Sequence, residues 1–281
     1  MKRRIIFFIT VLAILSLACS VSVDLPEPKT GATQTLEIGE DAPGNGPAEV
    51  YIGMGGGKLN IGPGADRLVE GKVQYNVETW KPEVSRSGSE VRIEQTIKDA
   101  AFLGGNVVNN WDLRLGEAPM ELTIQAGAYE GELDLSGIPL RSLNISDGAS
   151  KATVMFNLAN PEEMEEFTYS TGASNIDLQG LLNANFREMN FKGGAGNFTL
   201  DFSGKMSDDV KVFIDGGLGN MTLQVPKGVN AQINVSGGLN NVSTQGTWTI
   251  EGQEYHTIGA EGPLLKIQVN MGVGNLRLVN R

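Results

Sequence analysis

"FKGGAGNFTLDF", residues 191–202, is one of several versions of a single phrase in this chain. Close versions are "YSTGASNIDL" at 169–178, "IDGGLGNMTLQV" at 214–225, "VSGGLNNVS" at 235–243 and "VNMGVGNLRLV" at 269–279, and looser ones stand at 145–156, 124–135 and 52–61. A ligand-binding loop occurs once or twice in a domain. A phrase that returns this often indicates architecture.

The spacing of the phrase predicts a solenoid. The glycines that align are Gly127, Gly148, Gly172, Gly194, Gly217, Gly238 and Gly272, at successive intervals of 21, 24, 22, 23, 21 and 34 residues. A fixed period in this range is typical of stacked repeats. The last interval contains one period plus an insertion, at 246–262.

Each period alternates apolar and polar residues on both sides of the glycine. In one period the apolar positions are Val210, Val212 and Ile214 before the glycine and Met221, Leu223 and Val225 after it. Alternate residues of a strand share a face, so both strands would point their apolar side chains inward. The glycine would mark the corner, where positive φ or close backbone approach excludes a Cβ. We therefore expect an all-β fold, a parallel β-solenoid in which each coil pairs with the next.

An asparagine follows the aligned glycine by three residues in five periods: Asn175, Asn197, Asn220, Asn241 and Asn275. Stacked coils would place these amides above one another. Because an amide both donates and accepts, identical side chains can hydrogen-bond along a ladder. The phrase is thus interpreted as a coil corner and not as an active site.

The beginning of the chain resembles a bacterial lipoprotein signal. Lys2, Arg3 and Arg4 precede an apolar run that ends in "LACS", and Cys19 is the only cysteine. This pattern predicts a signal peptide over 1–18 and a diacylglycerol on Cys19. Ser16 stands where the usual pattern has leucine. The alternatives are a plain signal peptide with an incidental cysteine, or an uncleaved anchor.

Without residues 1–18 the chain has 19 Lys and Arg against 33 Asp and Glu, a formal net charge of −14. This charge argues against nucleic acid as a partner and against electrostatic attraction to an anionic lipid surface. One cysteine permits no internal disulfide. Stability must therefore come from packing and backbone hydrogen bonds.

Composition divides the remaining chain into three parts. Residues 19–46 are rich in Pro, Gly, Thr and acids, which predicts a flexible tether behind the lipidated cysteine. Residues 47–118 read as a β-hairpin module with a turn at "SRSGSEV" and with Trp80 and Trp111 as core anchors. Residues 119–281 form the predicted solenoid domain.

Two stretches of the sequence resemble cofactor-binding motifs but do not match them. "GMGGGKL" has three residues between Gly53 and Gly57, and Leu59 follows Lys58, so it does not fit a P-loop. A calcium β-roll would need Asp where the phrase has Phe198 or Met221. We expect no nucleotide, no metal and no cofactor.

The insertion holds the candidate partner-binding residues Trp248, Tyr255 and His256. Aromatic residues on a protruding element often anchor a partner. The alternative is a hairpin that folds back and caps the final coil, hiding its open edge. His256 is the only histidine, and no catalytic triad or zinc site can be assembled around it.

"VYIGMGGGKLNIG", "LVEG" and "WKPEV", within residues 48–118, resemble the N-terminal module of the toast-rack family of exported bacterial proteins. The repeating coils are similar to the solenoids of that family and of adhesin and Lia-type envelope-stress proteins. The resemblance implies a rack of stacked strands at the cell surface with no established enzymatic residues. In the Lia-type relatives the domain helps to control a sensor of wall damage, and those relatives usually carry membrane helices.

The sequence therefore predicts a non-catalytic, adhesin-like protein of the cell envelope. It would be lipid-anchored on the extracytoplasmic face of a bacterial membrane and would bind or scaffold an envelope polymer or protein. One alternative is an accessory regulator of envelope-stress sensing. Another is a carbohydrate-active β-helix enzyme, which would need a cluster of Asp, Arg, Lys or His along one face, and the outward positions show no such cluster.

Overall fold

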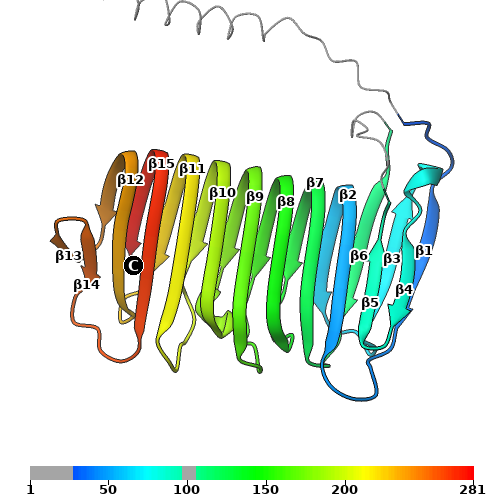
Figure 1. Ribbon diagram of the computed structural model, residues 1–281, viewed down its shortest axis with the longest axis horizontal. Coiled ribbons are helices and arrows are strands. Elements are labelled where there is room, and N and C mark those ends of the chain that lie inside the picture. The colour runs from blue at the N-terminus through cyan, green and yellow to red at the C-terminus, as the bar shows by residue number, and fades with distance from the viewer. Residues whose placement is uncertain (1–27, 97–105) are drawn as a thin grey trace, which may run out of the picture.

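The structure, a computed structural model, describes residues 28–96 and 106–281, so Cys19 and the predicted signal peptide lie outside it. Its strands form one sheet that is folded back on itself into a flattened solenoid (Figure 1). The elements are β1 (Gln34–Glu40), β2 (Ala48–Pro63), β3 (Val69–Tyr75), η2 (Glu78–Trp80), β4 (Glu83–Ser87), β5 (Glu90–Glu94), β6 (Asn109–Leu115), β7 (Met120–Asp134), β8 (Leu140–Met155), β9 (Met164–Gln179), η3 (Leu181–Ala184), β10 (Phe186–Asp201), β11 (Val210–Val225), β12 (Asn230–Gln245), β13 (Trp248–Glu251), β14 (Glu254–Thr257) and β15 (Leu264–Asn280).

The predicted all-β parallel solenoid is confirmed. Strands β2, β7, β8, β9, β10 and β11 pair in parallel, in that order. The sequence predicted two short strands per coil, whereas the structure has one long strand that bends at the glycine and continues down the other face. Hydrogen bonds to the neighbouring coils accompany both halves of each strand. The register aligns Asn197 with Asn175 on one side and with Asn220 on the other.

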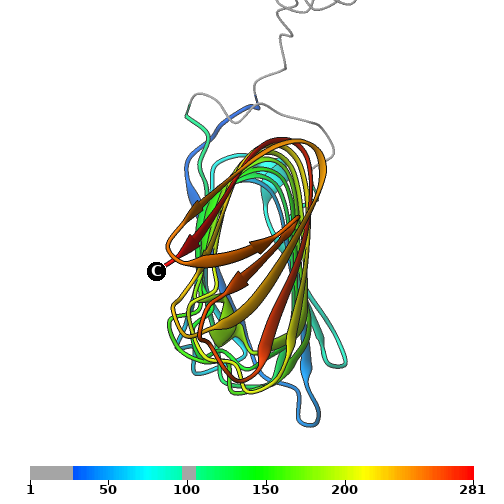
Figure 2. The same cartoon turned by 90° about the vertical axis from the view of Figure 1, so that its left-hand side faces the viewer.

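The core lies between the two faces of the solenoid, which Figure 2 shows end-on. Alternation sends apolar side chains of both halves inward, so Val212 and Leu223 of β11 are completely buried. Aromatic rings fill the middle coils. Phe191 packs edge-on against Phe198, with ring centroids 5.3 Å apart, and lies 5.9 Å from Tyr169.

The stack of coils begins before residue 119. Strand β2 pairs in parallel with β7 from Ala48 opposite Met120 to Ile61 opposite Leu133. On its other side, β5 pairs with the first half of β2 and β6 with the second half. The predicted module at 47–118 therefore contributes a complete coil to the solenoid. Its expected hairpin turn joins β4 to β5, and Trp80 and Trp111 are buried as expected.

Part of the predicted tether is a strand. Residues 34–40 form β1, which pairs antiparallel with β3. The short alternation of Leu36 and Ile38 places Ile38 in the core, at 5% exposure. This alternation contains only two apolar residues and lies among Gly, Thr and acidic residues. The composition of the segment therefore predicted a tether and not a strand. The chain between Cys19 and the first strand is correspondingly shorter than predicted.

The last strand in the sequence is not the last coil in the rack. Strand β15 lies between β11 and β12, with Ile267 opposite Val212 on one side and Ile233 on the other. The expectation that each coil pairs with the next is therefore wrong at this end. All coils carry the same apolar pattern, so β12 fits against β15 as well as a sequential neighbour would fit.

The insertion forms the hairpin β13–β14 across the C-terminal end of the solenoid (Figure 2). Strand β14 pairs antiparallel with β12, with Tyr255 opposite Ile233. Trp248 and Tyr255 are partly buried against the core. Of the two alternatives, these contacts favour the cap over a freely projecting element.

Candidate functional site: the corner edge

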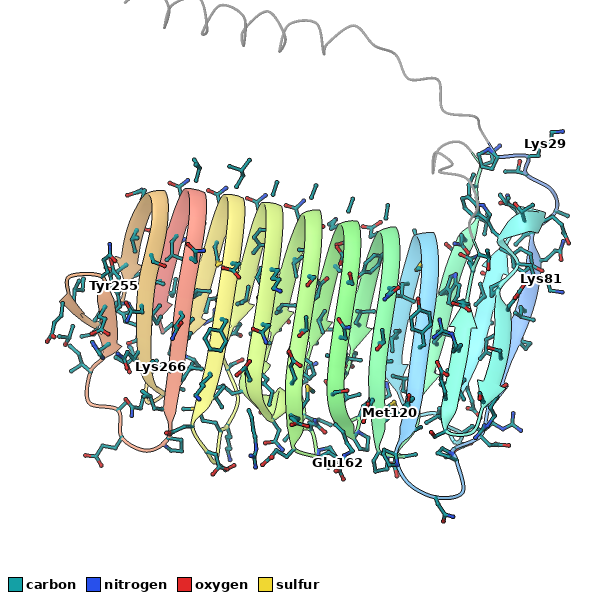
Figure 3. All side chains as sticks on the ribbon, viewed as in Figure 1. Lys29, Lys81, Met120, Glu162, Tyr255 and Lys266 are labelled. Atoms are coloured by element: carbon teal, nitrogen blue, oxygen red, sulfur yellow. The ribbon has the colours of Figure 1, made fainter. Side chains whose placement is uncertain are left out.

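The coils bend along one long edge of the rack, which we call the corner edge (top of Figure 3). Its apex residues, in the order of the coils, are Gly56, Ala128, Ala149, Ala173, Ala195, Leu218, Val273 and Leu239. The opposite edge, the turn edge, holds the polar turns that join successive strands. Most of the repeated phrase therefore maps to the corner edge.

The aligned glycines form a column beside the apex residues. A Cβ on Gly148 would lie 2.7 Å from the carbonyl oxygen of Gly127, and one on Gly272 would lie 2.6 Å from that of Gly217. Real Cβ atoms do not approach this closely, so each glycine permits the next coil to pack. The prediction that close backbone approach excludes a Cβ at these corners is confirmed.

The predicted asparagine ladder is present on the corner edge. The Asn197 amide donates to Asn175 Oδ1 at 2.7 Å, Asn220 donates to Asn197 Oδ1 at 2.8 Å, and Asn275 donates to Asn220 Oδ1 at 2.8 Å. Asn241 stands opposite Asn275 in the register. Because β15 is inserted out of order, the hydrogen-bonded ladder passes from Asn220 to Asn275, and Asn241 follows Asn275 in the register.

Replacing Asn197 with alanine should remove two rungs of this ladder. The side chain is exposed, so water can satisfy the groups left on Asn175 and Asn220. We expect the free energy of unfolding to fall by about 1 kcal/mol, the usual net contribution of such hydrogen bonds. Urea denaturation measures this, with Thr199→Ala, outward-facing on the same strand, as the control. A loss no larger than that of the control would contradict a stabilising ladder.

The same column changes chemistry in the N-terminal coils. Lys58, Glu130 and Lys151 occupy the positions that asparagines occupy further along. Lys151 Nζ lies 3.4 Å from Glu130 Oε1 in an exposed ion pair. Lys58, Glu130 and Lys151, with neighbouring residues, line a broad, open groove over these coils. This column is thus charged at one end and neutral at the other.

A buried polar network lies under the corners of β8 and β9. The Asp147 carboxylate accepts hydrogen bonds from the hydroxyls of Tyr169, at 2.9 Å, Thr171 and Ser174, at 3.3 Å. In β10 and β11 glycines occupy the positions equivalent to Asp147 and Ser174. This network was not predicted from the sequence. Its signal was the change from "GGAGN" to "SDGASK" and "STGASN" in two adjacent coils.

Burial raises the pKa of Tyr169 and Tyr129, and the negative Asp147 adds to the rise for both. Both phenols therefore stay protonated at neutral pH, and Tyr169 can donate to Asp147. With three hydroxyl donors on one carboxylate, the network is satisfied internally. Its arrangement stabilises two corners.

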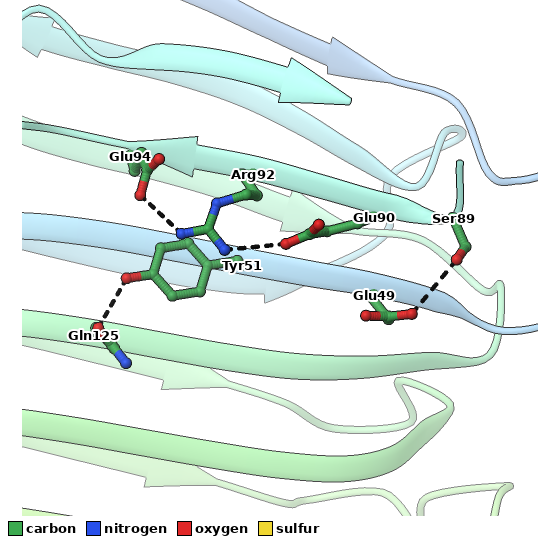
Figure 4. Close-up of polar contacts among 7 residues, drawn as sticks. All are labelled: Glu49, Tyr51, Ser89, Glu90, Arg92, Glu94 and Gln125. Atoms are coloured by element: carbon green, nitrogen blue, oxygen red, sulfur yellow. Dashed lines mark hydrogen bonds and ion pairs between the residues drawn. The ribbon is translucent and has the colours of Figure 1, made fainter. Parts of the chain in front are cut away.

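A second polar cluster joins β5 to β2 on one face (Figure 4). The Arg92 guanidinium lies 3.8 Å from the centroid of the Tyr51 ring and pairs with Glu90 and Glu94, at 3.0 Å each. Hydrogen bonds to Glu94 and then to Glu90 raise the pKa of Arg92. Tyr51 in turn donates to Gln125 of β7 at 2.8 Å. The positive charge of Arg92 is therefore paired with Glu90 and Glu94 inside the cluster.

The predicted partner-binding residues all lie on the capping hairpin. The indole of Trp248 donates to the carbonyl oxygen of Gln245 at 3.1 Å. His256 stands opposite Gln232, and its Nε2 lies 3.7 Å from Glu254 Oε2. Trp248 stands opposite Thr257, so it shares a face of the hairpin with Tyr255, whereas His256 points to the other face. The contacts of Trp248 and Tyr255 with the core serve the cap. Partner binding by these residues stays a prediction.

Within residues 28–96 and 106–281, no three His, Cys, Asp or Glu side chains gather closely enough to hold a metal ion. The helices among those residues are all too short or too polar to cross a membrane.

Comparison with known proteins identifies the family. The model of the toast_rack N-terminal domain, DUF2154, matches residues 27–168 and 164–224. The second match falls entirely within the repeated coils. No curated protein matches the chain.

Two solved structures are similar to the chain. One is a candidate cell adhesion protein from Clostridium sporogenes, at 23% identity and a TM-score of 0.49, covering 90% of this chain and 100% of the other. The second is a candidate adhesin from Bacteroides fragilis, at 9% identity and a TM-score of 0.38, covering 90% and 99%. The family match extends over more than half of the sequence, and the chain belongs to the toast-rack family.

Proposed function

We propose that this chain is a lipid-anchored, non-catalytic protein of the bacterial cell envelope that binds or scaffolds an extended partner in an adhesin-like manner. The observation that carries the proposal is the regular surface of the rack. Outward side chains on the faces of the rack, such as those of Thr199 and Thr222, stand opposite each other in adjacent coils at the spacing of about 4.8 Å. A repeating polymer can meet such an array at many points, so weak contacts add up to useful affinity.

The arrangement of polar groups supports a non-catalytic role. The single histidine, His256, lies on the capping hairpin beside Glu254. The most buried carboxylate cluster, around Asp147, is saturated by hydroxyl donors that hold two corners together. The glycines that resemble a phosphate loop lie against the backbone of the adjacent coil, and this contact explains why they are glycines. Each of these features is explained by the stability of the rack.

Binding to an envelope polymer is tested by sedimentation. The full chain, purified in detergent, is mixed with isolated, insoluble cell-wall polymer and centrifuged. We expect saturable co-sedimentation that soluble fragments of the same polymer reduce. A detergent-solubilised lipoprotein of unrelated fold serves as the control. Sedimentation equal to that of the control would contradict polymer binding.

Anchoring is tested separately on cells that produce the full chain. We expect the protein in the membrane fraction, with an N-terminal peptide whose mass shows diacylglycerol on Cys19 and no residues 1–18. Cys19→Ser should move the protein out of the membrane fraction. An unmodified Cys19 would contradict the lipid anchor, as would a Cys19→Ser protein that has lost residues 1–18 and still remains with the membrane.

A further inference from the structure

The corner edge has an exposed aliphatic patch at its C-terminal end. Leu218 is 57% exposed and Val273 is 49% exposed, and the two stand opposite each other on β11 and β15. The equivalent apex residues of the middle coils are alanines. Large side chains thus replace small ones where the column on one side of the apex is the uncharged asparagine ladder. On the other side of the apex, Asp215 of β11 stands opposite Lys192 and Asn270.

The two edges of the rack differ in charge. Exposed or half-exposed acidic residues of the turn edge are Asp66, Glu117, Glu162, Glu163, Asp208, Asp209 and Glu261. The turn edge has fewer basic residues, which include Arg67, Arg187, Lys205, Lys227 and Arg281. On the corner edge, Lys58, Lys151 and Lys192 are balanced by Glu130, Glu132 and Asp215, and Asp215 accepts a hydrogen bond from Asn270 at 3.2 Å. The negative charge of the protein is therefore concentrated away from the corner edge.

The described chain starts on the side of the corner edge. Lys29 lies beyond the bends of the coils at the end of the rack formed by β1 (Figure 3). Cys19 stands only nine positions before Pro28, a stretch that can span at most about 30 Å. A lipid on Cys19 thus enters the membrane within about 30 Å of this end of the corner edge. Leu218 lies eight strand spacings from β1, about 40 Å along the rack.

From these placements we propose that the corner edge faces the membrane and that Leu218 and Val273 insert into its lipid surface. The lipid anchor would hold one end of the rack and the aliphatic patch the other, so that the rack lies along the bilayer with its acidic turns pointing outward. The contact is apolar, which suits a protein whose overall charge opposes anionic lipids. This inference rests on the lipid anchor of the proposed function.

The depth of a probe at position 218 tests the inference. The chain has a single cysteine, and lipidation blocks it, so a maleimide dye reacts only with an introduced cysteine. Full-length Leu218→Cys protein is labelled with an environment-sensitive dye and reconstituted into phosphatidylethanolamine and phosphatidylglycerol vesicles. Leu158→Cys is the matched control, since Leu158 is a 66% exposed leucine on the turn edge. We expect quenching by spin-labelled lipids to be at least several-fold stronger at 218.

The outcomes separate this inference from the anchor. Anchored protein with equal, weak quenching at both positions would overturn the membrane-facing edge and leave the lipid anchor intact. Maleimide reaction of wild-type protein at Cys19, together with failure to enter vesicles, would overturn both. Protection of position 218 in native envelopes without quenching in pure vesicles would indicate a protein partner and would likewise overturn the lipid contact.

Discussion

Replacing Gly219 with alanine is expected to lower the free energy of unfolding by about 3 kcal/mol or more. Gly219 has φ of +131°, a conformation that residues with a side chain rarely adopt. A Cβ at this position would also overlap the carbonyl oxygen of Gly196 in the adjacent coil. The substitution therefore combines backbone strain with a steric clash, and the two coils cannot separate without losing their shared hydrogen bonds.

Gly228 provides the matched control because it has positive φ, +90°, but no atom within 4 Å of its Cβ position. Gly228→Ala should therefore show the backbone effect alone, about 1 kcal/mol. Urea denaturation of both variants gives the comparison. Equal losses would contradict the close packing of the corners, since both glycines have positive φ and only Gly219 has a neighbouring atom at its Cβ position.

The repeated parts of the fold could be predicted from the sequence because each repeat confirms the others. The alternation around Gly194 and Gly217 defines the inward face of each coil, and the spacing defines the stack. The asparagine ladder followed from the same alignment, since residues at one position of a regular coil must meet. In all three cases the information is local, and it recurs in several coils.

Features that occur once escaped prediction. Strand β1 depends on Leu36 and Ile38, too short a pattern to stand out from a polar segment. The Asp147 network depends on Tyr169, Thr171 and Ser174 approaching one carboxylate from a neighbouring coil, and sequence distance does not reveal this. The candidate surface consists of Leu218 and Val273, which replace the alanines of the middle coils. The sequence shows this replacement but does not show that both side chains are exposed on one edge.

The position of β15 could not be predicted because its pattern occurs in every coil. The pattern is too similar to that of its neighbours to show which coils are adjacent. β12 aligns with β11 in the phrase as well as it does with β15, so the repeat alone does not decide the order of the last coils. The structure has β15 in the middle, and β12 receives the hairpin β13–β14 on its outer side. Strand β15 thereby lies inside the rack, and the hairpin covers the first half of the outermost strand, β12, at residues 232–234.

This order predicts which coils respond to damage in β15. Ile267 is completely buried and stands between Val212 of β11 and Ile233 of β12. Ile267→Asp buries a charged group without a partner and should lower the free energy of unfolding by about 4 kcal/mol or more. In a stack, the damage should remain near the substituted coil. We expect hydrogen exchange to lose protection in β11 and β12 together, while β7, β8 and β9 keep theirs.

Lys266→Asp on the same strand is the matched control. Lys266 is exposed and stands between Lys211 and Gln232, so an acidic residue there meets a lysine and should change stability by less than about 0.5 kcal/mol. If β15 followed β12 at the end of the rack, β12 would shield β11 from the Ile267→Asp substitution. Loss of protection in β12 with full protection in β11 would therefore contradict the inserted strand, because the two orders differ in whether β11 touches residue 267.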